Sequence, residues 1–294
     1  ASAFSSTTGP NNVAIGLNAL YYNQTGGQNV AIGTSALTGA SGQSHTGNVA
    51  IGQAAMSANT TGGNNVAVGA YALDANTTGA SITAIGYNSL TANTTGTTVT
   101  AVGASALAAQ TTGGGHVAVG DTAMTSQTTA TNNTAIGSAS MRTATTGGNN
   151  TAVGMNSMYY TTTGSSNLSL GTSSMTANTT GSSNVAVGRS AMLANTTGSS
   201  NVAVGANSLD ANTTGSSNSA VGSNALGVNT TGGYNVALGV NALDANTTAD
   251  SNVALGYAAL GANTTASANT AVGYDAMVLN TTGTNNVAVG YKVL

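Results

Sequence analysis

The chain has 294 residues, and only 3% of them are charged. Lys and Arg together number three, and the six acidic residues are all Asp. Three cations cannot displace the counterions of a nucleic acid, and the absence of Cys excludes a disulfide scaffold and a thiolate metal site. Hydrophobic residues make up 40% of a chain with net charge −3, which argues against charge-repelled disorder, and no apolar run approaches the ~20 residues that insertion into a membrane needs.

A 17-residue repeat fills the chain from residue 12 onward. The sequence Asn-Val-Ala-Val-Gly at 201–205 returns with small changes at 218–222, 235–239 and 252–256. Seventeen copies begin at positions 12, 29, 48, 65 and then at the same interval to 286, with two extra residues inserted between 39 and 45. We therefore expect residues 1–11 to form a partial coil and residues 12–294 to form a single repeat domain, with one copy in each coil.

Each copy opens with Asn and a short apolar stretch that predicts a β-strand. Position one is Asn in 14 copies, and we expect a buried Asn ladder hydrogen-bonded from coil to coil. Position two is mostly Val, position three is Ala in 16 copies, and position four is Val, Ile or Leu in all 17. Alternation along the strand places positions two and four on one face and position three on the other. We expect Val204, Val187 and Val221 to be buried in one ladder.

The rest of each copy predicts a second short segment and a turn. Position five is Gly and position nine is Leu or Met in all 17 copies. We expect Leu209, Met192 and Leu226 to form another buried ladder. Asn-Thr-Thr-Gly then suits a turn, because these residues accept φ > 0 and bond their own backbone. No stretch carries a useful helical apolar stripe, so the repeats predict an all-β parallel β-solenoid of 17 coils, each formed by one 17-residue copy.

The alanine column at position three allows two interpretations. Sixteen Ala and one Ser, each followed two residues later by an invariant Gly, indicate that something approaches this face closely. The interpretation that we favour is a second chain, with Ala203, Ala186 and Ala220 as assembly residues, most simply in a homotrimer. In the alternative, both faces of the strand lie inside one narrow coil and Ala simply fits.

The Asn-x-Thr sequence of the turn is formally an N-glycosylation acceptor. Glycans on neighbouring coils would lie about 5 Å apart and crowd one another, so turn formation is the preferred interpretation. Glycan decoration of Asn or Thr, and ordering of water or ice by the Thr array, are the alternatives. The eleven candidate asparagines are Asn23, Asn59, Asn76, Asn93, Asn178, Asn195, Asn212, Asn229, Asn246, Asn263 and Asn280.

No arrangement of residues in the sequence indicates catalysis. His45 lies in the inserted segment and His116 in the Asn column, so the two do not form a converging set of metal ligands. Asp74, Asp210 and Asp244 share copy position ten, which we interpret as part of a solvated turn. Ser and Thr are abundant but have no base partner. We expect no enzyme activity, no cofactor and no metal.

Two stretches of the repeat carry a resemblance to known families. Residues 201–209, Asn-Val-Ala-Val-Gly-Ala-Asn-Ser-Leu, resemble repeats in the heads of trimeric autotransporter adhesins. Residues 269–280 look like arrays in phage tail-fibre-like and bacterial surface proteins. The resemblance covers residues 12–294 and implies a left-handed β-roll with three chains around one axis, in an extracellular, cell-surface or virion fibre location. The coil is three residues longer here, at the Asn-Thr-Thr-Gly turn.

These features favour a structural fibre or filament subunit over a receptor-binding adhesin or tail fibre, because the array contains only one small irregularity. End-to-end assembly is also expected. Leu294 occupies copy position nine, and residues 7–11 read as the turn and spacer that would complete that coil. Phe4 and its neighbours in one subunit would then continue the ladder after Leu294 of another. A chain boundary that falls within a coil by chance is the alternative.

Overall fold

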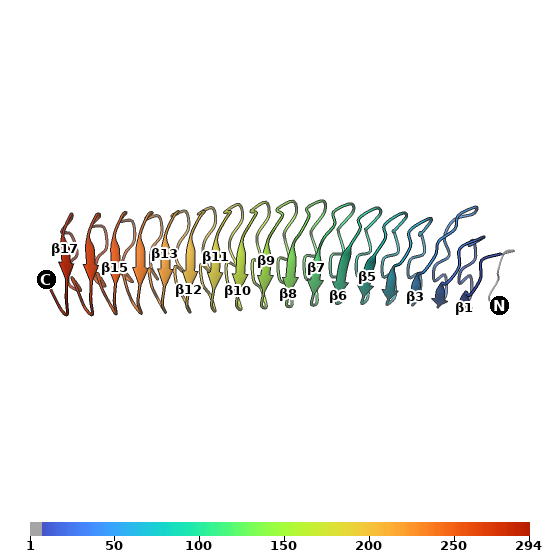
Figure 1. The fold of residues 1–294 in the computed structure, drawn as a ribbon, viewed down its shortest axis with the longest axis horizontal. Coiled ribbons are helices and arrows are strands. Elements are labelled where there is room, and N and C mark those ends of the chain that lie inside the picture. The colour runs from blue at the N-terminus through green and yellow to red at the C-terminus, as the bar shows by residue number, and fades with distance from the viewer. Residues whose placement is uncertain (1–7) are drawn as a thin grey trace. The chain divides into compact units, whose positions relative to one another are not determined.

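The computed structural model describes residues 8–294 as short parallel β-strands joined by turns, with no helix among them. One strand stands in each coil (Figure 1). The chain divides into two compact units, with the boundary between Gly148 and Asn149. The prediction of an all-β parallel β-solenoid with a 17-residue turn is confirmed. The single domain over residues 12–294 and the left hand stay predictions.

The strands begin at copy position two, as expected, in all but two coils. The first unit contains β1 (Val13–Ile15), β2 (Val30–Ile32), β3 (Val49–Ile51), β4 (Val66–Val68), β5 (Ile82–Ile85), β6 (Val99–Val102), β7 (Val117–Val119) and β8 (Thr134–Ile136). The second unit contains β9 (Thr151–Val153), β10 (Leu168–Leu170), β11 (Val185–Val187), β12 (Val202–Val204), β13 (Ser219–Val221), β14 (Val236–Leu238), β15 (Val253–Leu255), β16 (Thr270–Val272) and β17 (Val287–Val289).

Within each unit, every strand pairs in parallel with the strand of the next coil. The register joins equal copy positions: Ala203 pairs with Ala220, and Val204 pairs with Val221. The two-residue insertion does not shift this register, because β2 and β3 still pair Val30 with Val49. The extra residues are therefore accommodated in the loop between these strands, and identical side chains stack into columns along each unit.

The invariant glycine at position five ends each strand in a conformation that L-residues rarely adopt. Gly205 has φ +137°, and a Cβ on this residue would lie 2.5 Å from the carbonyl oxygen of Gly222 in the next coil. Both the backbone angle and the contact exclude a side chain. The same combination recurs along the column, which explains why no copy carries another residue.

The interior of the coil is formed by copy positions one, three, eight, nine and twelve. Leu209, Met192 and Leu226 at position nine are 0% exposed, so the predicted Leu/Met ladder is confirmed. Position eight, on the wall opposite the strand, carries mostly Ala or Ser. In one coil Ser169, the exception in the alanine column, lies 2.8 Å from Ser174 at position eight, measured between their hydroxyl oxygens. The two walls are therefore very close at this level.

The predicted burial of the valine columns is wrong. Val204, Val187 and Val221 lie on the outer face of the strands and are partly exposed, whereas Ala203 and Ala220 are 0% exposed within a single chain. The expectation that the alanines contact a second chain is wrong for the same reason, and it applies equally to Ala186, which is also 0% exposed. The second interpretation of the column holds, since alanine fits inside one narrow coil.

The physical reason is the width of the coil at the strand. Ala at position three faces Ala or Ser at position eight, and two small side chains leave no room for Val between the walls. The larger buried side chains, Leu or Met and Asn, lie to either side of this narrow point. Period-two alternation separates two sets of side chains, but it does not say which set faces inward.

Candidate functional site

The asparagines at position one form a hydrogen-bonded ladder, as predicted. The Oδ1 of Asn201 accepts a hydrogen bond from the backbone nitrogen of Asn218 at 2.9 Å, and its Nδ2 donates to the carbonyl oxygen of Gly215 at 2.9 Å. Each carboxamide therefore satisfies a backbone donor of the next coil and a backbone acceptor of its own coil. In the second unit this ladder is continuous from Asn150 to Asn286.

Three coils replace this asparagine, and each compensates. β5 and β6 begin one residue early, so Ile82 pairs with Val99 as an ordinary strand residue. His116 instead imitates the amide: its Nε2 lies 2.8 Å from the carbonyl oxygen of Ala130, and its Nδ1 accepts from the backbone nitrogen of Asn133 at 3.1 Å. These contacts fix a neutral ring with its proton on Nε2, and burial lowers the pKa of His116.

A second ladder, at position twelve, was not predicted. The Nδ2 of Asn212 donates to the Oδ1 of Asn195 at 2.8 Å and to the carbonyl oxygen of Gly215 at 3.0 Å. Its Oδ1 accepts from the Nδ2 of Asn229 at 2.9 Å. These side chains run through the second unit from Asn178 to Asn280 in an unbroken series. From Asn178 onward, both ladders therefore converge on one carbonyl in each coil, that of position fifteen, which is Gly215 here and Ala249 or Ala266 in two later coils.

Position twelve contains the eleven asparagines considered for glycosylation, and that interpretation is wrong for the folded chain. All except Asn280 are 0% exposed, and Asn280 is partly buried with its Nδ2 bonded to the Oδ1 of Asn263 and the carbonyl oxygen of Gly283. A glycan would have to be attached to this same amide nitrogen. The preferred interpretation, turn formation, agrees with the bond from Asn212 to the carbonyl three residues later.

The two threonines of the turn have different roles. The Oγ1 of Thr213, at position thirteen, donates to the carbonyl oxygen of Thr230 in the next coil at 3.0 Å. Thr214, at position fourteen, is exposed. The first threonine therefore extends the coil-to-coil bonding, and the second belongs to a hydroxyl-bearing outer surface on the turn side of the coil.

The inserted segment places a histidine inside the first unit. The carbonyl oxygen of His45 accepts from the Nδ2 of Asn29 at 2.8 Å, so His45 takes the place that Gly has at position fifteen of other coils. Its ring is buried, with neither nitrogen hydrogen-bonded, and burial lowers the pKa of His45 to about 4. The imidazole is therefore a neutral space-filling group.

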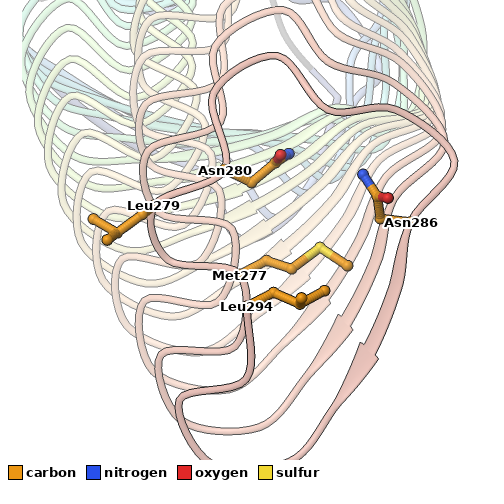
Figure 2. Close-up of a pocket in the computed structure, with 5 residues that line it drawn as sticks. All are labelled: Met277, Leu279, Asn280, Asn286 and Leu294. Atoms are coloured by element: carbon orange, nitrogen blue, oxygen red, sulfur yellow. The ribbon is translucent and has the colours of Figure 1, made fainter.

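Of the two residues predicted to join subunits end to end, Phe4 lies outside the described residues. Leu294 is 77% exposed and borders a cavity of about 280 Å³ (Figure 2). Figure 2 shows Met277 and Leu294 close together, with the amides of Asn280 and Asn286 above them. All four belong to columns that are buried elsewhere, so the cavity is coil interior. Its lining is completed by Leu279.

Outside these ladders, the described residues offer few chemical groups. Among residues 8–294, no three His, Asp or other ligand side chains lie close enough to hold a metal ion. Partial burial raises the pKa of Asp210 and of Asp244. No helix in this range is long and apolar enough to cross a membrane.

No model of a protein family matches the chain, and no curated protein matches it.

Proposed function

We propose that the chain is a structural subunit of an extracellular fibre or filament, which assembles with itself laterally and end to end, with a homotrimer as the lateral unit. The observation that carries this proposal is the pair of asparagine ladders. In the second unit the buried carboxamides of positions one and twelve bond from coil to coil, as Asn201 does to Asn218 and Asn212 to Asn229. Groups that could bind a ligand are used to hold coils together.

Such an arrangement suits a load-bearing element. Each coil contacts only its neighbours, so stability grows with the number of stacked coils. The nine strands of the second unit form a stack about 40 Å long at a spacing of about 4.8 Å per strand. From Asn178 onward the same two side-chain ladders recur in every complete coil of the unit, whereas the first coil carries Thr161 in place of the position-twelve Asn.

Electron microscopy of the purified full chain tests the proposal. We expect fibres at micromolar concentration in neutral buffer. The control is Ala203→Gln, which cannot be accommodated inside the coil and should abolish both folding and fibres. Fibres from this control would show that they arise from unfolded chains. Isolated particles with the size of a single chain, at every concentration tested, would contradict the fibre role.

A rod segment of an adhesin or tail fibre is the second candidate, and an aromatic stack on the surface favours it. Tyr257 and Tyr274 stack with ring centroids 5.0 Å apart, Tyr274 and Tyr291 stack at 5.4 Å, and all three are exposed. This patch departs from the repeating surface, as a receptor site would. Replacing Tyr257 and Tyr274 with Thr should then abolish adhesion to host cells, whereas Tyr234→Thr, which alters an unstacked exposed tyrosine, should not. Equal adhesion of the two variants would contradict a receptor site here.

A further inference from the structure

The outer strand face, defined as copy positions two and four, is apolar at position four in every coil and apolar at position two in eleven coils, with Thr or Ser at position two in the other six. Position four is Val, Ile or Leu in all 17 coils, and no residue at either position is charged. In the middle of the second unit, Val236 is 38% and Leu238 is 51% exposed. The column therefore keeps its hydrophobic character although it lies outside the coil.

This pattern is the reverse of what a solvated sheet face carries. Strands that face water on one side alternate apolar inward and polar outward residues, and parallel sheets normally have both faces covered. Here the coil covers only the inner face. The turn side of the same coils shows what its solvent-facing surface looks like, because Thr197, Thr214 and Thr231 are exposed there. The outer strand face therefore has the composition of a surface that is covered.

We propose that the outer strand face packs against the same face of another copy of this chain. In the second unit, nine strands about 4.8 Å apart and the two residue steps from position two to position four cover roughly 43 by 7 Å, or about 300 Å² in plan. The strip of one unit is therefore about a third of the ~800 Å² per partner that standard interfaces bury, and the first unit adds the strip of its own eight strands.

The periodicity of the face selects a second copy as the occupant. Its side-chain rows repeat once per coil, and a face with the same repeat can interdigitate with them along its whole length, as sheets packed about 10 Å apart do. A partner of opposite charge has nothing to recognise at positions two and four. An anionic membrane would be held by cations, and the whole chain has three.

This inference rests on the proposed fibre role, since it supplies the lateral contact of the fibre, and replaces the alanine column in that role. The two ideas can fail separately. Fibres that form without the outer strand face would leave the fibre role intact and overturn the interface. Stable oligomers that use this face but never form fibres would support the interface and overturn the fibre role.

The test is a charge-patterned triple variant, V187E/V204K/V221E, compared with the wild-type full chain. Alternating signs on adjacent coils avoid repulsion within the ladder while placing charge across the face. The matched control, T197E/T214K/T231E, introduces the same charges in the same three coils on the exposed turn side. Light scattering coupled to size-exclusion chromatography measures the native mass, and circular dichroism monitors folding.

We expect the wild type and the turn-side control to share one oligomeric mass, and the face variant to fall to the 28.0 kDa of a single chain. An unchanged mass of the face variant would overturn the proposal. So would a wild-type chain that is monomeric at 100 micromolar, or one that floats with phosphatidylcholine–phosphatidylglycerol vesicles as a monomer.

Should the face variant fail to fold, thiol protection decides. The chain has no Cys, so V204C and T214C each carry a single thiol. In the assembled protein, we expect maleimide to label T214C at least tenfold faster than V204C, and dilution to the monomer to reduce that ratio severalfold, since Val204 is partly exposed in a single chain. Equal labelling rates in the oligomer would overturn the proposal.

Discussion

The Nδ1 of His116 lies 3.1 Å from the backbone nitrogen of Asn133 and accepts its hydrogen bond, which is the role that the Oδ1 of an asparagine has in neighbouring coils. The Nε2 of the same ring lies 2.8 Å from the carbonyl oxygen of Ala130, as an asparagine Nδ2 would. A neutral imidazole thus replaces a carboxamide without loss of either bond. A protonated imidazole cannot, because both of its nitrogens are donors.

His116→Asn should therefore reduce the acid sensitivity of the first unit. Burial lowers the folded-state pKa of His116, so the unfolded chain binds the proton first as pH falls. Its contribution to stability is complete above pH ~6.5 and declines as pH falls below that value. Thermal unfolding from pH 7.5 to 4 should show a smaller drop for His116→Asn than for wild type. Parallel curves would refute the assignment.

His45 gives a second acid-sensitive position with a defined window. The pKa is lowered from 6.5 to about 4 by burial, so folding loses stability between these two values as pH falls, and no further below the lower one. The full loss is roughly 3 kcal/mol, at about 1.4 kcal/mol per unit of pKa. His45→Leu should remove this dependence and raise the melting temperature even at pH 7, because both ring nitrogens are buried without partners. A lower melting temperature at pH 7 would mean that the ring is bonded.

Two glycines in the same coil should respond differently to alanine. Gly205→Ala places a Cβ on a residue with φ +137° and against the backbone of the next coil, and should cost roughly 3 kcal/mol. Gly215→Ala is the matched control, because a Cβ there would also approach a backbone oxygen of the next coil, that of Gly232, but its φ is not positive. Three coils already carry Ala at this position, as Ala130, Ala249 and Ala266. Denaturation midpoints should fall clearly for the first variant and little for the second, and equal shifts would be inconsistent with the backbone argument.

Asn212 tests the ladder that holds position twelve. Asn212→Ala leaves the Oδ1 of Asn195 buried without its donor and should cost about 1–3 kcal/mol. Asn212→Asp should cost more, because a carboxylate cannot donate to Asn195 or to the Gly215 carbonyl and is buried as well. Asn207→Ala, at an outer position with a 3.4 Å contact to Asn224, is the control and should shift the denaturation midpoint very little. A lower denaturation midpoint for Asn207→Ala than for either Asn212 variant would contradict the ladder.

Much of the fold follows from the sequence alone. The 17-residue period fixes where each strand lies and with what it pairs, so the register of Ala203 with Ala220 is predictable. The burial of the Leu/Met column and of the position-one Asn column is also predictable, because large apolar residues recur at position nine in every copy and Asn recurs at position one in 14 of them. These predictions depend only on spacing and on the stacking of equal positions.

The direction of the strand faces is not given by the period. Valine is more hydrophobic than alanine, which suggests that it lies inside, but the narrow coil reverses that preference. One signal was present: position two accepts Thr83, Ser219 and Leu168 in place of Val, as an outer position would, whereas position three varies only to Ser169. Uniform size indicates a tight interior better than hydrophobicity does.

The ladder at position twelve was missed because Asn-Thr-Thr-Gly is equally good turn chemistry. The replacements at this position hold the signal. Gln110, Gln127 and Thr161 are all polar, and all three are buried. Ala144 is the buried apolar exception. A buried column that is polar in nearly every coil indicates a hydrogen-bonding requirement in addition to a preference for a turn.

The central claim is that the alanine column faces inward and the valine columns face outward. It is tested most directly by the denaturation midpoints of Ala203→Val and Val204→Ala, measured under conditions in which the chain is a monomer. Ala203→Val adds two methyl groups at a residue that is 0% exposed between close walls, and should lower the midpoint by the equivalent of about 1–3 kcal/mol. Val204→Ala removes two methyl groups from the outer face and should change stability by less than about 1 kcal/mol. A large loss for Val204→Ala with little change for Ala203→Val would contradict the account.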